Sequence, residues 1–316
     1  MIPVDLITGF LGAGKTTFLL RYARYLLQKG ERLGILVYDH GAVNVDLPLL
    51  GTLRGDNCEV ETLAASCDAD CHRRRFRTKL IAMAMSGYDR ILIEPSGVFD
   101  MDEYFDTLRE EPLDRWLDFG NVICVADAKL GGDTLPEEDF FLASQAGCAG
   151  AIVFSRVQLA SGEELAQTRA HLRQAAEAIY ASLTDRVLAK DWDALSEEDF
   201  AALSRCGYAF PDYVKTIAGR AASFQSLSFL HLPLNEQQLR QKAEALFSTG
   251  DYGRILRVKG FFPKGESWYA FNATQHELTV KPAAESLAVL TVIGSDLNER
   301  AIHLLLTGEE LKLHIL

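Results

Sequence analysis

The run Leu-Ile-Thr-Gly-Phe-Leu-Gly-Ala-Gly-Lys-Thr-Thr at residues 6–17 decides the fold. It contains the spacing G-x-x-x-x-G-K-[ST], in which Gly9 and Gly14 are followed by Lys15 and Thr16. Glycines at these positions let backbone N–H groups surround phosphate oxygens, and the lysine adds a positive charge beside the β- and γ-phosphates. The run therefore predicts a phosphate-binding loop, with the Thr16 hydroxyl placed to ligate Mg²⁺.

The sequence on either side fits a loop between a strand and a helix. An apolar run at 4–7 predicts a strand, and 17–29 has helical spacing that stops at Gly30. The positive end of that helix would then point at the phosphates. The alternative, a glycine-rich turn with a chance lysine, requires motif and context to agree by coincidence.

The composition is that of a globular protein, because 48% of the residues are hydrophobic and 24% are charged. A length of 316 residues allows two domains. The formal net charge of −12 argues against a nucleic-acid partner and favours plain solubility. We expect no membrane span and no signal peptide, and hence a cytoplasmic protein. Its six cysteines are then expected to be thiols or metal ligands rather than disulfides.

Strands alternating with helices predict a mostly parallel α/β sheet with helices on both faces in the first part of the chain. Ligands of such sheets bind at the carboxyl ends of the strands, where the loop 39–46 and the turn 94–97 fall. The further strands expected here are 33–38, 90–94, 121–127 and 149–154, with a helix at 73–85. Helical patterns are expected from 162 to about 203, and 163–180 is the clearest amphipathic stretch among them.

The pattern changes near residue 220. A small α/β domain with a mostly antiparallel sheet is predicted beyond it, and we place the two domains at 1–220 and 221–316. Its expected strands are 223–232, 253–261, 266–272, 276–280 and 288–293, and its expected helices are 235–247 and 298–306.

Several motifs, taken in order, resemble those of the CobW-type metallochaperone GTPases, relatives of HypB and UreG. The loop at 9–17 is one of them, and the turn Glu-Pro-Ser-Gly at 94–97 is similar to the family's E-[TP]-[ST]-G. The resemblance covers nearly the whole chain and implies a P-loop NTPase domain followed by a CobW-type C-terminal domain. Further matching positions are Gly41, Val43 and Asp46 (G-x-V-x-x-D), Asp127, Ala128, Gln145, 257–261, Ile293 and Gly294.

The resemblance implies a slow GTP hydrolase that couples nucleotide state to delivery of a metal or cofactor to a client protein. It makes Lys15 the stabiliser of phosphate charge and Glu94 the partner of Thr16 in holding Mg²⁺, directly or through water. Asp46 is then the residue that positions the attacking water or binds the Mg²⁺ shell. It also implies a homodimer, which no single residue identifies. The implied nucleotide contacts are Gly9, Gly12, Ala13, Gly14, Lys15, Thr16, Thr17, Gly97, Ser155, Arg156 and Gln158.

The base-reading segment departs from the family pattern [NS]-K-x-D, because it reads Ser155-Arg156-Val157-Gln158. An aspartate carboxylate accepts two hydrogen bonds from guanine, whereas the Gln158 amide offers one acceptor and two donors. Arg156 can still lay its stem and guanidinium plane on the base. GTP stays the first choice by resemblance, with ATP as the alternative; Gln158 as a plain solvated loop residue is also open.

The family's C-x-C-C metal cluster is altered as well. It corresponds to Ser-Cys-Asp-Ala-Asp-Cys-His-Arg at 66–73, where carboxylates, thiols and an imidazole suit Zn²⁺ or another borderline divalent ion. The alternative is a solvated acidic turn before a basic helix. The implied metal ligands are Cys67, Asp68, Asp70, Cys71 and His72, with Asp39 and His40 completing the coordination.

The loop at 39–46 keeps an acid at Asp39 but has Ala42 where the family carries a second one. Together with the altered base and metal motifs, this keeps a rival function open. The rival is a regulatory nucleotide-binding module that turns over little and acts by protein contact. An ATP-using relative is the third alternative.

Overall fold

The computed structural model describes residues 1–39, 50–64, 69–132, 134–214, 224–275, 277–283 and 285–309. The described chain forms two compact units, one ending at residue 214 and the other beginning at residue 224. The predicted boundary at 220/221 lies outside the described residues and stays a prediction. None of the described helices has the length and apolar character needed to cross a bilayer.

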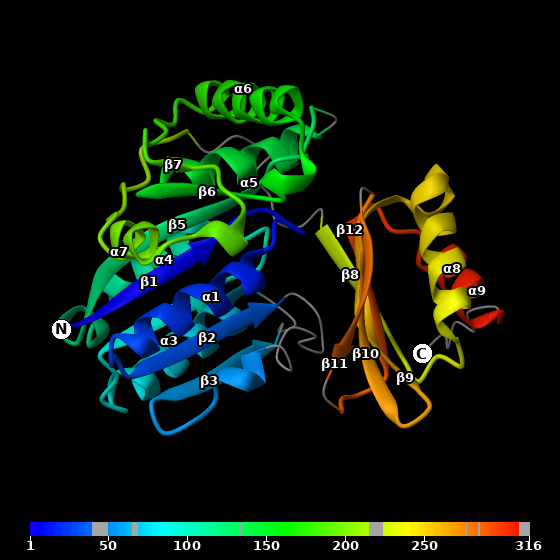
Figure 1. Ribbon diagram of the computed structural model, residues 1–316, viewed down its shortest axis with the longest axis horizontal. Helices are drawn as coiled ribbons and strands as arrows, with labels where there is room; N and C mark the ends of the chain where they lie inside the picture. The colour runs from blue at the N-terminus through cyan, green and yellow to red at the C-terminus, as the bar shows by residue number, and fades with distance from the viewer. Residues whose placement is uncertain are drawn as a thin grey trace. The chain divides into compact units, whose positions relative to one another are not determined.

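A seven-stranded sheet forms the centre of the first unit (Figure 1), in the order β3-β2-β4-β1-β5-β6-β7. All its neighbouring strands run parallel, so the predicted parallel sheet is confirmed. Strands of such a sheet are buried on both faces and read as continuous apolar runs. The strands are β1 (Ile2–Thr8), β2 (Leu33–Asp39), β3 (Cys58–Ala64), β4 (Arg90–Glu94), β5 (Leu117–Asp127), β6 (Ala151–Ser155) and β7 (Val187–Leu188).

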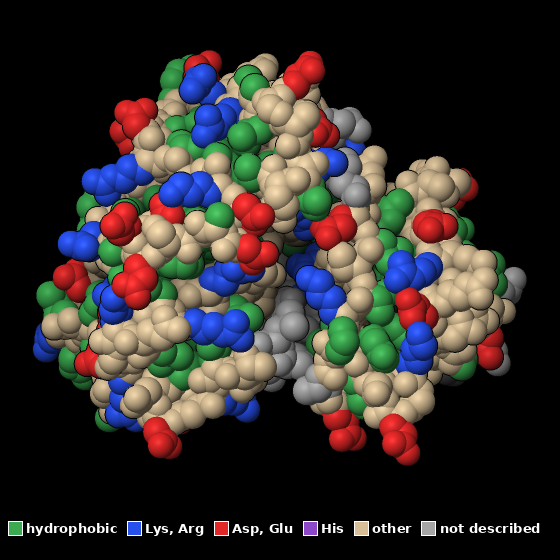
Figure 2. Space-filling view, in the orientation of Figure 1, with side chains coloured by type: hydrophobic (Ala, Val, Ile, Leu, Met, Phe, Trp, Pro, Cys, Tyr) green, Lys and Arg blue, Asp and Glu red, His purple; other side chains and the backbone are tan. Residues whose placement is uncertain are grey.

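Helices cover both faces of this sheet, as predicted. From one side, Tyr22 of α1 donates a hydrogen bond to Asp5 Oδ2 at 2.8 Å. On the other side, Tyr104 of α4 packs on Phe119. Phe119 is the register partner of Val4, and the side chains of Val4 and Asp5 point to opposite faces of the sheet because the two residues are adjacent in β1. The helices are α1 (Lys15–Gln28), α3 (Ala69–Ala84), α4 (Met101–Arg109), α5 (Pro136–Gly147), α6 (Gly162–Ala178) and α7 (Glu197–Leu203). Basic and acidic side chains are interspersed on the face of this unit drawn in Figure 2.

Four elements are absent from the sequence prediction: β3, α4, α5 and β7. Helix α5 is buried at nearly every position from Phe140 to Gly147, so its sequence has no polar face and no helical period. Strand β7 has only two residues, and it falls in a stretch that was expected to be helical. Burial on all sides and shortness both remove the periodic signal on which such predictions depend.

The second unit contains a five-stranded sheet in the order β11-β10-β9-β12-β8, with every pair antiparallel, which confirms the predicted sheet. Its core joins α8 and α9 to the sheet through Leu246, Ile302, Val258 and Val292. The elements are β8 (Phe224–Leu230), α8 (Glu236–Ser248), β9 (Arg254–Lys264), β10 (Ser267–Ala273), β11 (Leu278–Ala283), β12 (Val289–Ser295) and α9 (Glu299–Thr307).

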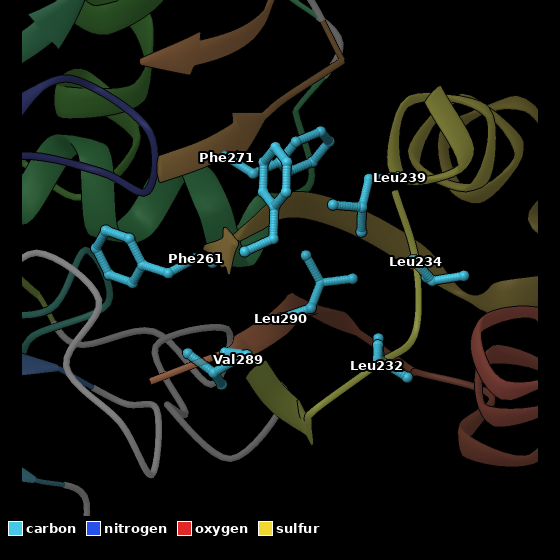
Figure 3. A pocket seen from close by; sticks show the side chains of 10 residues that line it. Leu232, Leu234, Leu239, Phe261, Phe271, Val289 and Leu290 are labelled. Carbon is cyan, nitrogen blue, oxygen red and sulfur yellow. The ribbon is translucent and has the colours of Figure 1, made fainter. Parts of the chain in front are cut away.

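A cavity of about 20 Å³ lies beside this core (Figure 3). It is lined by apolar residues such as Leu232, Leu239, Phe271 and Leu290. Because its lining offers no polar side chain to orient a ligand, the cavity is a packing gap rather than a binding site.

Candidate nucleotide site

The phosphate loop connects the end of β1 to the start of α1 and lies tight against the sheet. Gly9 has a φ of 143°, a conformation that L side chains rarely adopt. A Cβ added to it would lie 2.2 Å from the carbonyl oxygen of Val125 in β5. Only glycine fits this position. The predicted contacts Gly12, Ala13, Gly14 and Thr17 lie in the same loop and in the first turn of α1.

Lys15 folds back over this loop. Its side chain is buried, and Nζ donates to the carbonyl oxygens of Gly9 at 2.9 Å and Phe10 at 3.4 Å. A buried ammonium needs such acceptors. These two carbonyl oxygens hold the positive charge directly over the loop, whose backbone N–H groups are predicted by the motif to bind phosphate.

Thr16 and Glu94 meet at the carboxyl edge of the sheet. The Thr16 hydroxyl donates to Glu94 Oε1 at 2.6 Å, and both residues are buried. Thr16 lies in the first turn of α1, and Glu94 ends β4, which pairs with β1. A hydroxyl and a carboxylate are oxygen ligands of the kind that Mg²⁺ prefers. The donor set at this point therefore fits Mg²⁺.

The turn after β4 packs on the phosphate loop. A Cβ added to Gly97 would lie 2.4 Å from the backbone nitrogen of Leu11, so this close approach requires glycine. Two side chains hold the turn: Ser96 Oγ accepts from the N–H of Val98 at 3.2 Å, and Gln145 Nε2 donates to the carbonyl oxygen of Gly97 at 3.0 Å. The turn and the loop thus form one continuous surface.

The predicted base segment follows β6. Ser155 is buried and its hydroxyl donates to the carbonyl oxygen of Ala126 at 3.4 Å. Arg156 has a positive φ of 56°, and its Nη1 binds Asp127 Oδ2 at 2.7 Å and the carbonyl oxygen of Gly12 at 3.1 Å. Gln158 lies exposed in the short 3-10 turn Val157–Leu159. The structure therefore brings Arg156 to the phosphate loop and leaves Gln158 at the surface.

Comparison with known families agrees with this geometry. Residues 3–181 match the family model described as CobW/HypB/UreG, nucleotide-binding domain. The chain belongs to the CobW/HypB/UreG family. Residues 224–308 match the model described as the cobalamin synthesis protein cobW C-terminal domain. The family relationship predicted from the motifs is thus confirmed for both parts of the chain.

Three relatives show the range of this CobW-type similarity. Zinc chaperone YeiR of Escherichia coli is 30% identical over 132 residues, which span 41% of this chain and 39% of YeiR. Zinc-regulated GTPase metalloprotein activator 1 of Schizosaccharomyces pombe is 23% identical over 90% of this chain and 78% of its own length. Zinc chaperone YjiA of Escherichia coli is 29% identical over 52% of each chain. The matches to YeiR and YjiA thus span less than two thirds of those proteins.

Among solved structures, the Zn(II)-bound YjiA GTPase of E. coli is similar over 97% of this chain and 98% of the YjiA chain, with 20% identity and a TM-score of 0.35.

Trp192 lies beside the candidate nucleotide site of this CobW-type chain and is not predicted from the sequence. Trp192 follows β7, and its indole Nε1 donates to the carbonyl oxygen of Phe154 at 2.9 Å. The ring packs edge-on against Phe18 with centroids 5.6 Å apart, and a Cβ added to Gly14 would lie 3.2 Å from it. Trp192 therefore supports the last glycine of the phosphate loop. No spacing in the sequence marks it.

The predicted metal ligands are described only in part. Among the described residues, no group of three or more His, Cys, Asp or Glu side chains is arranged to hold a metal ion. Cys71 is half-buried in the first turn of α3. The metal site stays a prediction. His40, Asp46, Cys67 and Asp68 lie outside the described residues, and of Asp39, Asp70 and His72 only the backbone is described, at the end of β2 and in α3.

Four other cysteines lie in the core. Burial raises the pKa of the Cys58 thiol to about 11 and the pKa of Cys124 and Cys206 to about 12, and it raises the pKa of Cys148 as well. Such groups stay neutral thiols, whereas metal binding requires thiolates. Cys124 and Cys148 are thus small core residues.

Proposed function

We propose that this chain is a slow GTP hydrolase whose nucleotide state controls delivery of a metal ion, or of a cofactor, to a client metalloprotein. The observation that carries the proposal is the Thr16–Glu94 hydrogen bond at the foot of a loop that already holds Lys15 over its backbone carbonyls. A loop with a buried lysine and an adjacent hydroxyl–carboxylate pair suits a triphosphate.

In this proposal the backbone N–H groups of residues 12–17 surround the β-phosphate, helped by the positive end of α1. Phosphate oxygens replace the carbonyls of Gly9 and Phe10 as the acceptors for Lys15. Thr16 and Glu94 hold Mg²⁺, which supplies neutralisation of charge on the β- and γ-phosphates when it is bound. Asp46, assigned by motif alone, positions the attacking water.

The choice of nucleotide depends on Arg156 and Gln158. Membership of the CobW/HypB/UreG family favours GTP. Gln158 lies at the surface, and its amide cannot accept both guanine hydrogen bonds as a carboxylate would. This supports weaker discrimination against ATP than an aspartate would give. ATP is therefore the second candidate substrate.

The metal part of the proposal rests on the relatives and on the ligand-capable side chains at 67–72. Two of these relatives are named zinc chaperones and a third is named a zinc-regulated GTPase metalloprotein activator. Zn²⁺ or a similar divalent ion is then the cargo, and Cys71 is the one proposed ligand whose side chain is described.

Single-turnover phosphate release from GTP and from ATP tests the enzyme proposal. Lys15→Ala is expected to lose nucleotide affinity by about 2–5 kcal/mol, the scale of one charge-assisted contact in a buried site. Lys79→Ala is the matched control, because Lys79 lies outside the candidate site and forms a half-exposed ion pair with Glu61. Lys15→Ala binding both nucleotides like the wild type would refute the phosphate site. Tight binding by the wild type without phosphate release would favour the regulatory module.

A further inference from the structure

The side chain of Gln145 is fully buried in the last turn of α5. Its Nε2 donates to the carbonyl oxygen of Gly97, 48 residues earlier in the chain. Its Oε1 is buried and has no hydrogen-bond partner among the described residues. Burying half an amide unpaired is costly, and an apolar side chain would fill the same space without that cost. Packing alone therefore does not account for a glutamine here.

The contact fixes the orientation of one peptide group. In the Gly97–Val98 peptide, the carbonyl accepts from Gln145 and the N–H donates to Ser96 Oγ. The N–H of Phe99 closes the same turn by donating to the carbonyl oxygen of Ser96 at 3.2 Å. Because both ends of the peptide are bonded, Gly97 has little freedom to rotate.

The peptide is fixed where it touches the phosphate loop. A Cβ on Gly97 would lie 2.7 Å from the Cα of Leu11 and 2.8 Å from the carbonyl carbon of Phe10. The carbonyl of Phe10 is also an acceptor for Lys15. Gln145 thus contacts Gly97, and Gly97 in turn contacts the phosphate loop. The turn lies on the side of the loop next to Glu94.

We propose that Gln145 is a positioning residue for the γ-phosphate: it holds the Gly97 turn against the phosphate loop and thereby sets the preference for nucleoside triphosphate over diphosphate. This inference rests on the proposed function. The β-phosphate is held by the loop and Lys15, so a diphosphate does not depend on the Gly97 turn. A triphosphate extends towards that turn and meets it in the orientation that Gln145 imposes.

The test compares two variants on one helix. Gln145→Met keeps the length of the side chain and removes the donor. The control, Ser144→Ala, removes a buried hydroxyl whose one hydrogen bond among the described residues stays within α5, to the carbonyl oxygen of Phe141. Affinities for fluorescent GDP and for a non-hydrolysable GTP analogue are measured, together with single-turnover hydrolysis. For Gln145→Met we expect GDP affinity within about twofold of the wild type, and about tenfold losses in analogue affinity and hydrolysis rate.

Equal losses for both nucleotides would show a merely structural role and overturn the inference, as would unchanged values. If Gln145→Met does not fold, Gln145→Leu decides, because it also removes the donor to the Gly97 carbonyl and places no charge in the buried site. Its analogue affinity should fall while its GDP affinity holds, and a constant ratio of the two would overturn the inference. A wild type that binds both nucleotides but releases no phosphate would contradict the proposed function alone, since the affinity ratio still reports on Gln145.

Discussion

Arg156 binds the phosphate loop directly, because both of its terminal nitrogens lie 3.1 Å from the carbonyl oxygen of Gly12, 144 residues away. The same guanidinium forms an ion pair with Asp127, and both side chains are only 16% exposed. This contact connects the segment proposed to hold the base with the loop proposed to hold the phosphates. A change at Arg156 should therefore affect binding of the whole nucleotide.

Arg156→Ala is expected to weaken nucleotide binding by about 1–3 kcal/mol, the scale for loss of charge-assisted hydrogen bonds in a mostly buried site. Arg156→Lys should recover only part of that, because an ammonium lacks the planar fork that serves Gly12 and Asp127 together. Titration calorimetry with GTP and ATP measures both. Arg115→Ala, at an exposed pair with Glu111, is the control. Wild-type affinity in Arg156→Ala would show that the contact has no part in binding.

Gln158→Asp is expected to increase the preference for GTP over ATP. A carboxylate at this position can accept two hydrogen bonds from guanine, and a good bidentate base contact contributes about 1–3 kcal/mol of discrimination. Competition between GTP and ATP for the wild type and the variant measures the change. Gln167→Asp, at an exposed position on α6, controls for added charge. An unchanged preference would mean that this segment does not read the base.

The elements that the sequence predicts are those whose signals are local. The phosphate loop is a contiguous motif, and strands such as β1 and β2 are short apolar runs that lie next to recognisable turns. The amphipathic helix α4 also carries a local signal that the prediction overlooks: the Asp100 side chain caps it by accepting from the N–H of Asp102 at 3.1 Å.

The contacts that complete the candidate site are not local. Gln145 meets Gly97 across 48 residues, Arg156 meets Gly12 across 144, and the Trp192 carbonyl accepts from Arg21 across 171. Spacing along one chain reports which face of an element is buried, but it does not report which distant side chain lies opposite. These three contacts could therefore be found only from the structure.

Asp5 forms a buried polar centre in the first unit. Its carboxylate accepts from Tyr22, from Arg90 and from both the backbone and the side-chain amide of Asn121. Asp5→Ala is expected to lower the free energy of unfolding by about 3–5 kcal/mol, because it leaves the mostly buried Arg90 without this partner. Chemical denaturation measures the change.

Glu31→Gln is the comparison for that experiment. Glu31 binds the same arginine through Nε at 2.7 Å but is itself 27% exposed, so its loss is expected to cost about 1 kcal/mol or less. Similar losses for the two variants would contradict the assignment of Asp5 as the energetically dominant partner of Arg90.

The metal proposal predicts that the chain binds about one Zn²⁺-like ion through residues 67–72. Each altered family position there keeps a ligand-capable side chain, but with fewer thiolates than the family pattern, so the affinity for a soft ion should be lower than in relatives with the full cysteine cluster. The double variant Cys67→Ser, Cys71→Ser should lose the ion and keep nucleotide binding.

Cys58→Ser is the matched control, because that thiol is buried in β3 and stays protonated. Metal analysis and chelator competition measure the stoichiometry and the affinity. A zinc content near zero in the wild type, or an unchanged content in the double variant, would leave this segment as an acidic turn and favour the regulatory module.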